Sequence, residues 1–84
     1  MNVKIYSTSW CPYCRKAKAI LDGKGIAYEE INIEEKGMSR DDLSKITGGM
    51  SVPQIVINDE PIGGYDNLWV LNQNGELDKK LNIE

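Results

Sequence analysis

The segment Cys11-Pro12-Tyr13-Cys14 holds the residues of this 84-residue chain that are best suited to chemistry. The nucleophile in thiol chemistry is the thiolate, and a free cysteine with a pKa of about 8.5 is only a few per cent ionised at neutral pH. The chain contains no histidine, which excludes nucleophiles activated by histidine and also zinc or haem sites with histidine ligands. Any reaction must therefore run on thiols, carboxylates, amines or hydroxyls.

A predicted strand and helix place these thiols where their ionisation is favoured. Residues 3–6 alternate between apolar and polar side chains, which indicates a short strand. Apolar residues then recur at helical spacing from Pro12 until the glycines at positions 23 and 25. Cys11 thus lies at the helix start, where unpaired backbone N–H groups and the positive end of the helix dipole stabilise an anion. Cys14 lies one turn further along, within reach of a disulfide bond with Cys11.

The two cysteines are expected to differ in role. Cys11 is predicted to face the loop and solvent and to attack, while Cys14 points back along the helix and resolves the mixed disulfide. Trp10, directly before Cys11, is expected to pack beside the site or to shield the thiol. Two structural interpretations stay open, namely an inert disulfide and a four-cysteine metal site shared across a dimer. Within one chain, no further cysteine or histidine completes a set of four ligands.

The remaining pattern extends this unit to the element order β-α-β-α-β-β-α in one domain, residues 1–84. Strands are predicted at residues 28–33, 53–57 and 61–62, the last two joined by a turn at residues 58–60. Because a helix joins the strands at 3–6 and 28–33, these two strands should be parallel. A second helix starts at a capping sequence at residues 39–42 and ends at the glycines 48 and 49. Asp66 is predicted to cap a third helix that runs to about Leu71, and Leu77 and Leu81 indicate a final helical turn or two.

Charge and hydropathy exclude other classes of protein. The net charge of −3 and the sequence pI near 4.9 exclude an extended phosphate-binding surface for nucleic acid. The apolar run at the N-terminus is too short for a signal peptide, and no stretch reaches the roughly 18 apolar residues of a membrane span. We therefore expect a cytoplasmic protein with no nucleic-acid or membrane partner. In such a reducing compartment, a cysteine pair is more often redox-active or metal-binding than structural.

Two further motifs gain meaning beside the thiols. Val52-Pro53 precedes an apolar strand and, taken alone, is a proline at a strand start. A cis peptide bond there would instead leave the Val52 backbone facing a groove, where it can hold an extended peptide. Gly63-Gly64-Tyr65-Asp66 is most simply a turn before a helix, but glycines before a helix N-terminus also expose amides that bind a carboxylate.

The chain resembles a dithiol glutaredoxin of the small bacterial type over nearly its whole length. The resemblance rests on three motifs in the family's order and spacing: Cys11-Pro12-Tyr13-Cys14, Ser51-Val52-Pro53 and Gly63-Gly64-Tyr65-Asp66. It implies the thioredoxin fold, an α/β fold with a four-stranded mixed sheet flanked by helices, and a cis-proline loop opposite the cysteines. It also implies a glutathione-dependent thiol-disulfide oxidoreductase that acts on disulfide-containing or glutathionylated proteins, with glutathione as cosubstrate and no metal. A monomer is expected.

The resemblance assigns roles to individual residues. Cys11 is the nucleophile and Cys14 the resolving thiol. The backbone of Val52 pairs with the cysteinyl part of glutathione, Pro53 is the cis-proline, and the γ-glutamyl end is received by Gly64, Tyr65 and Asp66. The full set implied in glutathione binding is Thr8, Tyr13, Ser51, Val52, Pro53, Gly64, Tyr65, Asp66 and Asn67.

Several positions depart from the family pattern and keep other interpretations open. Thr8 stands where many glutaredoxins have lysine, Gly49 and Met50 where some have a basic residue, and Asn67 where a second acidic residue is common. Fewer charged side chains are then available to bind glutathione. One alternative is therefore a glutaredoxin-like electron donor that is reduced by a thioredoxin-reductase-type flavoprotein instead of by glutathione. A metal or iron–sulfur carrier that uses Cys11 across a dimer is a further alternative.

Overall fold

The computed structural model describes residues 2–82, so Met1 and residues 83–84 of the predicted domain lie outside the described residues. Four strands form one sheet in the order β2-β1-β3-β4, namely β1 (Val3–Ser7), β2 (Glu29–Asn32), β3 (Gln54–Ile57) and β4 (Glu60–Gly63). β1 runs parallel to β2 and antiparallel to β3, and β3 is antiparallel to β4. The predicted four-stranded mixed sheet is therefore confirmed.

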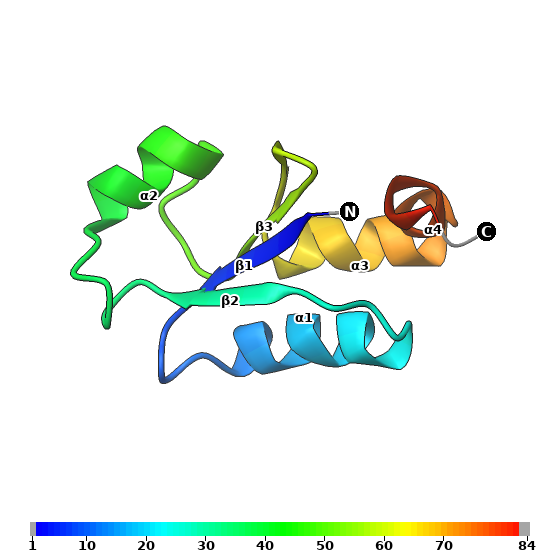
Figure 1. Ribbon diagram of the computed structural model, residues 1–84, viewed down its shortest axis with the longest axis horizontal. Helices are drawn as coiled ribbons and strands as arrows, with labels where there is room; N and C mark the ends of the chain where they lie inside the picture. The colour runs from blue at the N-terminus through cyan, green and yellow to red at the C-terminus, as the bar shows by residue number, and fades with distance from the viewer. Residues whose placement is uncertain (1, 83–84) are drawn as a thin grey trace.

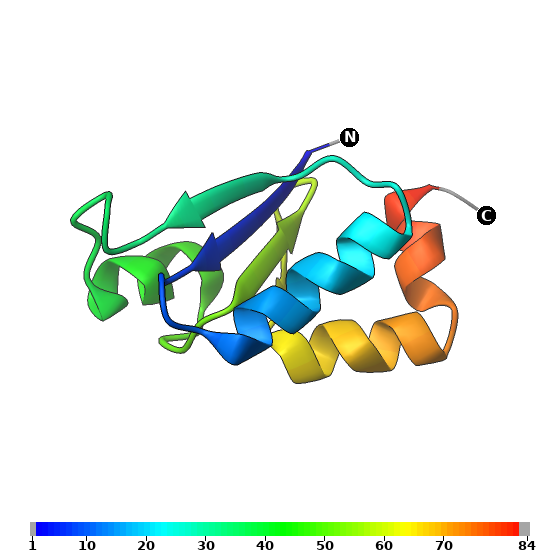
Figure 2. The same ribbon diagram turned by 90° about the horizontal axis from the view of Figure 1, so that it is seen from below.

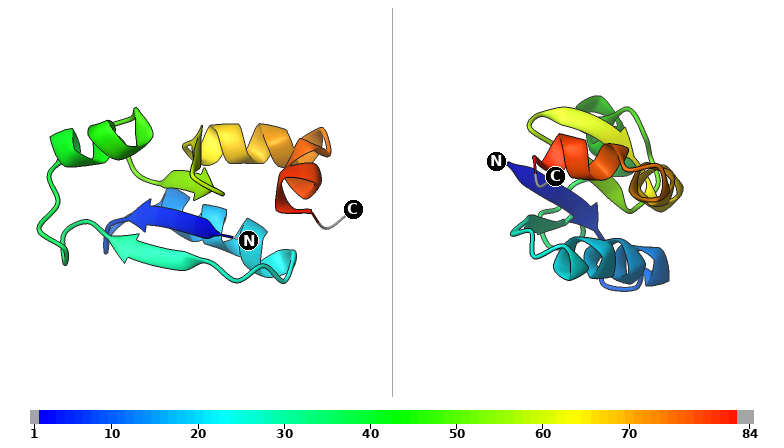
Figure 3. Two further views of the ribbon diagram at one scale, coloured as in Figure 1. Left: turned by 45° about the horizontal axis from the view of Figure 1, so that its top comes forward. Right: turned by 90° about the vertical axis from the view of Figure 1, so that its right-hand side faces the viewer.

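Helices cover both faces of this sheet (Figures 1 and 2). One face packs against α1 (Pro12–Gly23), α3 (Tyr65–Gln73) and α4 (Glu76–Leu81) through the buried residues Ala17, Leu21, Leu68, Leu77 and Leu81. The other face packs against α2 (Arg40–Thr47) through Leu43. Figure 3 shows α2 and α4 near opposite ends of the molecule.

The alternation of side chains along the strands explains the two layers. Val3 and Ile5 of β1 belong to the cluster under α1 and α3, whereas Tyr6 belongs to the cluster under α2. In β3, Ile55 and Ile57 join the first cluster and Val56 the second. Successive strand residues point to opposite faces, so a central strand with helices on both faces is apolar on both, as residues 55–57 of β3 are.

Local signals set the boundaries of the first two helices. Pro12 is the first residue of α1, and Cys11 is its N-cap. α2 begins with a capping box, in which the Ser39 hydroxyl accepts from the Asp42 backbone N–H at 3.1 Å and the Asp42 carboxylate accepts from the Ser39 N–H at 3.2 Å. The same helix ends at Gly48, whose φ of 82° lies in the left-handed region. These predicted boundaries are confirmed.

The predicted cap of the third helix is wrong. Asp66 lies inside α3, which begins at Tyr65 and has Gly64 at its N-cap position. The chain leaves β4 through Gly63, whose φ of 116° is open to glycine and strained for other residues. This turn starts the helix earlier than the polar cap pattern indicates, and the helix also continues past Leu71 to Gln73.

The hairpin between β3 and β4 is confirmed with a shorter turn than predicted. Asn58 and Asp59 both have positive φ, 50° and 67°, which is the conformation of a two-residue hairpin turn. Glu60 therefore opens β4 opposite Ile57 rather than belonging to the turn. The final helical turns predicted from the leucine pair form α4, a separate helix after α3. Within residues 2–82, every helix is too short or too polar to span a membrane.

Candidate active site

Cys11 and Cys14 form a disulfide bond at the N-terminus of α1, with their Cα atoms 5.1 Å apart. The Cys11 backbone is extended, with φ −150° and ψ 97°, so its side chain caps the helix. Its sulfur accepts a hydrogen bond from the backbone N–H of Cys14 at 3.1 Å. The predicted position of Cys11 at the helix start is confirmed, and that N–H points at the atom that carries the charge in a thiolate.

Cys11 is less accessible than predicted. Its exposed fraction is 7%, against 1% for Cys14, so the expectation that Cys11 faces solvent is wrong. The carbonyl oxygen of Val52 lies 3.8 Å from the Cys11 sulfur, and it comes from a loop 41 residues away in the chain. Cys11 keeps the larger opening of the two, which agrees with the order of attack predicted for the pair.

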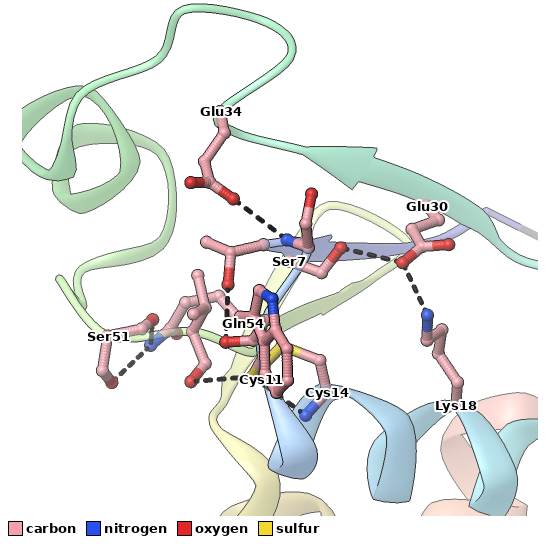
Figure 4. The surroundings of a disulfide bond; sticks show 12 residues. Ser7, Cys11, Cys14, Lys18, Glu30, Glu34, Ser51 and Gln54 are labelled. Carbon is pink, nitrogen blue, oxygen red and sulfur yellow. Dashed lines mark hydrogen bonds and ion pairs between the residues drawn. A yellow bond between two sulfur atoms is a disulfide. The ribbon is translucent and has the colours of Figure 1, made fainter.

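The loop over the cysteines contains the Val52–Pro53 peptide bond, which is cis as the resemblance implies. Gln54 holds the loop from within, since its buried side-chain amide donates to the Ser51 carbonyl at 2.9 Å and lies 3.4 Å from the Ser51 hydroxyl. Figure 4 shows Ser51 and Gln54 on one side of the disulfide and Lys18 and Glu30 on the other. The sequence alone does not identify Gln54, because the hydrogen-bond partner of a polar residue at the start of a strand cannot be predicted from the local sequence.

Gly49 leaves the space that the Gln54 side chain occupies. A Cβ atom at position 49 would lie 2.6 Å from Gln54 Nε2, closer than real Cβ atoms come. Gly49→Ala is therefore expected to displace Gln54 from the Ser51 carbonyl and to lower the free energy of unfolding by about 1–2 kcal/mol. Urea unfolding measures this change.

Gly23→Ala is the matched control for that substitution. A Cβ atom at Gly23, the last residue of α1, meets no atom within 4 Å, and alanine favours helix over glycine by up to about 1 kcal/mol. The control is expected to be neutral or stabilising. Equal unfolding free energies for the two variants would show that the contact between Gly49 and Gln54 does not constrain the loop.

A hollow of about 450 Å³ lies beside the cysteines, and we call it the Pro53 hollow. It gathers eight of the nine residues predicted to bind glutathione, namely Tyr13, Ser51, Val52, Pro53, Gly64, Tyr65, Asp66 and Asn67. These residues come from the start of α1, the cis-proline loop and the start of α3. Three motifs far apart in the chain therefore line one hollow.

Two tyrosines line one wall of the Pro53 hollow, and a lysine lies near their rings. The rings of Tyr13 and Tyr65 lie 5.7 Å apart and are tilted by 36°. Lys16 Nζ lies 5.1 Å from the centre of the Tyr13 ring and 6.0 Å from that of Tyr65, within the range of cation–π attraction. Lys16 thus places a cation at the edge of the hollow. Its position on α1 alone does not predict this.

The N-terminus of α3 also lines the hollow. Gly64 has no side chain with which to cap the helix, so the backbone N–H groups of the first turn keep their capacity for an anion. The exposed carboxylate of Asp66 lies in the same turn. The Asn67 side-chain amide donates to the Ile62 carbonyl at 3.1 Å, which orients Asn67 over Gly63. The Asp66 carboxylate, which can accept hydrogen bonds from an ammonium group, therefore lies close to backbone N–H groups that can donate to a carboxylate.

Thr8 is the predicted residue that the Pro53 hollow does not include. Its hydroxyl lies 3.4 Å from the Trp10 carbonyl oxygen, and it lines a second hollow with Trp10. Trp10 itself is 86% exposed, so the expectation that it packs beside the site or shields the thiol is wrong. The binding role of Thr8 stays a prediction.

A polar cluster lies beside α1 on the other side of the cysteines. The fully buried Ser7 hydroxyl donates to Glu30 Oε2 at 2.9 Å, and Lys18 Nζ donates to the same oxygen at 2.7 Å. The Lys18 hydrogen bond, aided by that from Ser7, holds the pKa of Glu30 below its ordinary value against the opposing effect of burial. The cluster ties α1 to the edge strand β2.

Removal of the Lys18 cation should give a stability change that depends on pH. A lowered pKa means that the contribution of Glu30 is fully present above its unfolded pKa of about 4.3 and is lost as the pH falls through the lower folded value. Lys18→Met is expected to destabilise by about 0.5–1 kcal/mol at pH 7, since both partners are partly exposed. Thermal unfolding at pH 7 and below pH 4 should show the deficit shrinking in acid. Lys36→Met serves as control, and a deficit that is the same at both pH values would contradict the expectation.

Side chains that could hold a metal ion form no group of three or more in the part of the chain that is described. The expectation of a metal-free protein remains a prediction.

The glutaredoxin family model matches residues 3–62. The chain belongs to the glutaredoxin family. It is 42% identical over 80 residues to glutaredoxin 3 of Escherichia coli strain K12, which covers 95% of this chain and 96% of that protein. Among solved structures, the glutaredoxin of Brucella melitensis is 36% identical, with a TM-score of 0.84 over 99% of this chain and 90% of that one. The buckwheat glutaredoxin in complex with glutathione is 26% identical, with a TM-score of 0.86 over 95% of this chain and 76% of that one.

This glutaredoxin has the thioredoxin fold, as predicted. Its activity is thiol-disulfide oxidoreduction, and the Cys11–Cys14 pair of the Cys-X-X-Cys motif is its redox-active centre. The disulfide seen here corresponds to the oxidised state of that centre. Two electrons and two protons convert it to the dithiol that reduces a substrate.

Proposed function

We propose that this glutaredoxin takes its electrons from glutathione and uses them to reduce protein disulfides and glutathionylated proteins. The observation that carries the proposal is the Pro53 hollow, which lies beside the Cys11 sulfur and combines an exposed main chain with groups that bind both signs of charge. Glutathione is a tripeptide with a central thiol, two carboxylates and one ammonium. The hollow offers a partner for each of these parts.

The main chain of Val52 receives the cysteinyl part of glutathione in this proposal. Val52 lines the hollow, and its carbonyl oxygen is 3.8 Å from the Cys11 sulfur. A peptide that pairs with this backbone in an extended conformation brings its own sulfur next to Cys11. The same arrangement holds the substrate sulfur in place for attack.

The γ-glutamyl end is received by the start of α3. Its carboxylate meets the uncapped backbone N–H groups after Gly64, and its ammonium meets Asp66. Lys16, at the edge of the tyrosine wall, supplies a cation for the glycyl carboxylate. The buckwheat glutaredoxin, which shares this fold, was solved as a complex with glutathione.

The reaction with a glutathionylated protein takes two displacements. The Cys11 thiolate attacks the glutathionyl sulfur, the protein thiolate leaves and takes up a proton, and Cys11 becomes glutathionylated. A second glutathione thiolate then attacks that glutathionyl sulfur. Glutathione disulfide leaves, and the Cys11 thiolate is restored. Overall, the mixed disulfide and one free glutathione become the protein thiol and glutathione disulfide, so the protein sulfur is reduced at the expense of one free glutathione thiol.

A protein disulfide takes the dithiol route. Cys11 attacks one substrate sulfur, and Cys14 then attacks Cys11, which releases the reduced substrate and leaves the Cys11–Cys14 disulfide. Two glutathione molecules reduce this disulfide in turn. Because Cys14 is one helical turn away and bonds to Cys11 directly, its attack competes well with that of an external thiol. We place this activity in the cytoplasm, where glutathione is kept reduced. We also propose that the protein acts as a monomer.

Asp66→Asn tests the glutathione proposal. Losing a charge-assisted bond to the ammonium should raise the KM for glutathione about 10-fold with little change in kcat. Asp41→Asn, the same change in the first turn of α2, is the control and should leave the KM unchanged. Turnover is followed by NADPH oxidation with glutathione reductase. Equal KM values for the two variants, or turnover with thioredoxin reductase that matches that with glutathione, would overturn the proposal in favour of the flavoprotein-reduced alternative.

The metal-carrier alternative has a separate test. Purification under reducing conditions, with metal analysis and an absorption spectrum, is expected to show a colourless protein without stoichiometric iron or zinc. A bound metal that disappears in Cys11→Ser would favour the carrier.

A further inference from the structure

A second hollow of about 480 Å³ is lined by Trp10, the residue directly before Cys11, and we call it the Trp10 hollow. Its lining residues are Thr8, Ser9, Trp10, Glu34, Glu35 and Arg40, none of which lines the Pro53 hollow in the described part of the chain. The residue after Trp10 is Cys11. Trp10 and Tyr13, on either side of Cys11 in the chain, therefore line two different hollows, of which glutathione needs one.

Trp10, one residue before Cys11 in the chain, presents an exposed apolar surface. It is the most exposed of the large apolar side chains in residues 2–82, at 86%. The exposed Met50 belongs to the same end of the molecule, since its carbonyl oxygen accepts a hydrogen bond from Arg40, another lining residue, at 3.0 Å. Exposed tryptophan beside a concave surface is the residue type that contributes most when a protein partner covers it.

The charge of the Trp10 hollow is negative. Glu34 and Glu35 follow the end of β2, and both are exposed. Glu34 is held in place, because its Oε1 accepts from the Ser9 backbone N–H at 3.0 Å, as the dashed line from Glu34 in Figure 4 marks. Arg40 is the cation of the lining, and its guanidinium is engaged with the Met50 carbonyl. Two carboxylates against one guanidinium favour a cationic ligand group.

We propose that the Trp10 hollow docks the polypeptide substrate and selects a segment with a lysine or arginine beside its disulfide-bonded cysteine. The apolar part of that segment covers Trp10, and its cation lies between Glu34 and Glu35. This rests on the proposed function, since it assigns protein substrates to the same Cys11 centre. The Pro53 hollow then stays free for glutathione while the substrate is attached.

The experiment is a single-turnover reaction between the reduced protein and peptides with an internal disulfide, without glutathione. One peptide carries lysine beside each cysteine, and its counterpart carries glutamate. In each reaction the protein dithiol becomes the Cys11–Cys14 disulfide and the peptide disulfide becomes two thiols. Quenched samples resolved by mass spectrometry give the second-order rate constants. Rates are normalised to those with hydroxyethyl disulfide, a small neutral substrate.

The wild-type protein is expected to react about 10-fold faster with the lysine peptide than with the glutamate peptide. In the double variant Glu34→Gln/Glu35→Gln the ratio should fall to about 2 or less, because the glutamine at position 34 can still accept from Ser9 while the charges are gone. Glu76→Gln, on α4, should keep the wild-type ratio. Trp10→Ala should slow both peptides about 10-fold relative to hydroxyethyl disulfide.

An unchanged peptide ratio in the double variant, or normal peptide rates in Trp10→Ala, would overturn the docking proposal. Because glutathione is absent from the assay, either result leaves the role of the Pro53 hollow untouched. Conversely, an unchanged KM in Asp66→Asn does not affect the peptide ratio. The two proposals therefore fail independently.

Discussion

Cys11→Ser is expected to lower the reduction of disulfides by more than about 1,000-fold, whether the substrate is a protein disulfide or a glutathione mixed disulfide. A serine hydroxyl has no appreciable anionic fraction at neutral pH. The Cys14 N–H that bonds to the Cys11 sulfur, together with the helix dipole, can favour a thiolate by a few kcal/mol at most. That is far too little to ionise an alcohol. Turnover with glutathione, glutathione reductase and NADPH measures the loss.

Cys14→Ser is the matched variant, because it removes the same disulfide and changes the same atom type. It is expected to keep most of the activity toward a small glutathione mixed disulfide, whose reduction needs only Cys11 and a second glutathione. It should lose most of the dithiol-dependent reduction of protein disulfides. Thermal unfolding of both variants under reducing conditions controls for folding. If Cys11→Ser kept turnover while Cys14→Ser lost it, the roles of the two cysteines would be reversed.

Leu68→Ala is expected to lower the free energy of unfolding by about 2–5 kcal/mol, a large share of the stability of so small a domain. Leu68 lies on α3, is 0% exposed, and packs with Ile5, Leu21 and Ile55 in the cluster under α1 and α3. Truncation removes apolar contacts and leaves a cavity that the sheet and two helices cannot easily close. Urea unfolding of the reduced protein gives the change.

Val70→Ala on the same helix is the control. Val70 is 51% exposed, so its truncation should change the unfolding free energy by no more than about 0.5 kcal/mol. The start of α3 also lines the Pro53 hollow. Leu68→Ala is therefore expected to weaken the binding of glutathione under conditions in which the domain is still folded. A loss below about 1 kcal/mol would mean that α3 is held by other contacts than this cluster.

The elements that sequence reasoning located well are those with local causes. The capping box at Ser39 and Asp42, the proline at the start of α1 and the left-handed glycine at position 48 each act within a few residues. The apolar run of β3 follows from helices on both faces of one central strand. For the site, the three motifs contain seven of the eight residues that line the Pro53 hollow, and the eighth, Asn67, directly follows the third motif.

The structure differs from the sequence-based predictions where contacts with a distant segment set the local structure. The sequence predicts Asp66 as the cap of α3 because a carboxylate is a good cap, but the path from β4 through Gly63 starts the helix at Tyr65. Thr8 is implied in glutathione binding by its place in the family pattern, three residues before Cys11, and this role stays a prediction. In space, the loop turns it into the Trp10 hollow.

The sequence by itself determined the redox pair, its position at a helix start and the alternation of strands and helices, since these follow from spacing over one or two turns of chain. The exposure of the reacting sulfur and the groups around it, by contrast, come from the packing of distant segments. Cys11 is covered by a loop 41 residues away, and Trp10, expected to lie over the site, points into solvent instead. Such burial depends on contacts between segments that are distant in the chain, and side-chain periodicity carries no information about them.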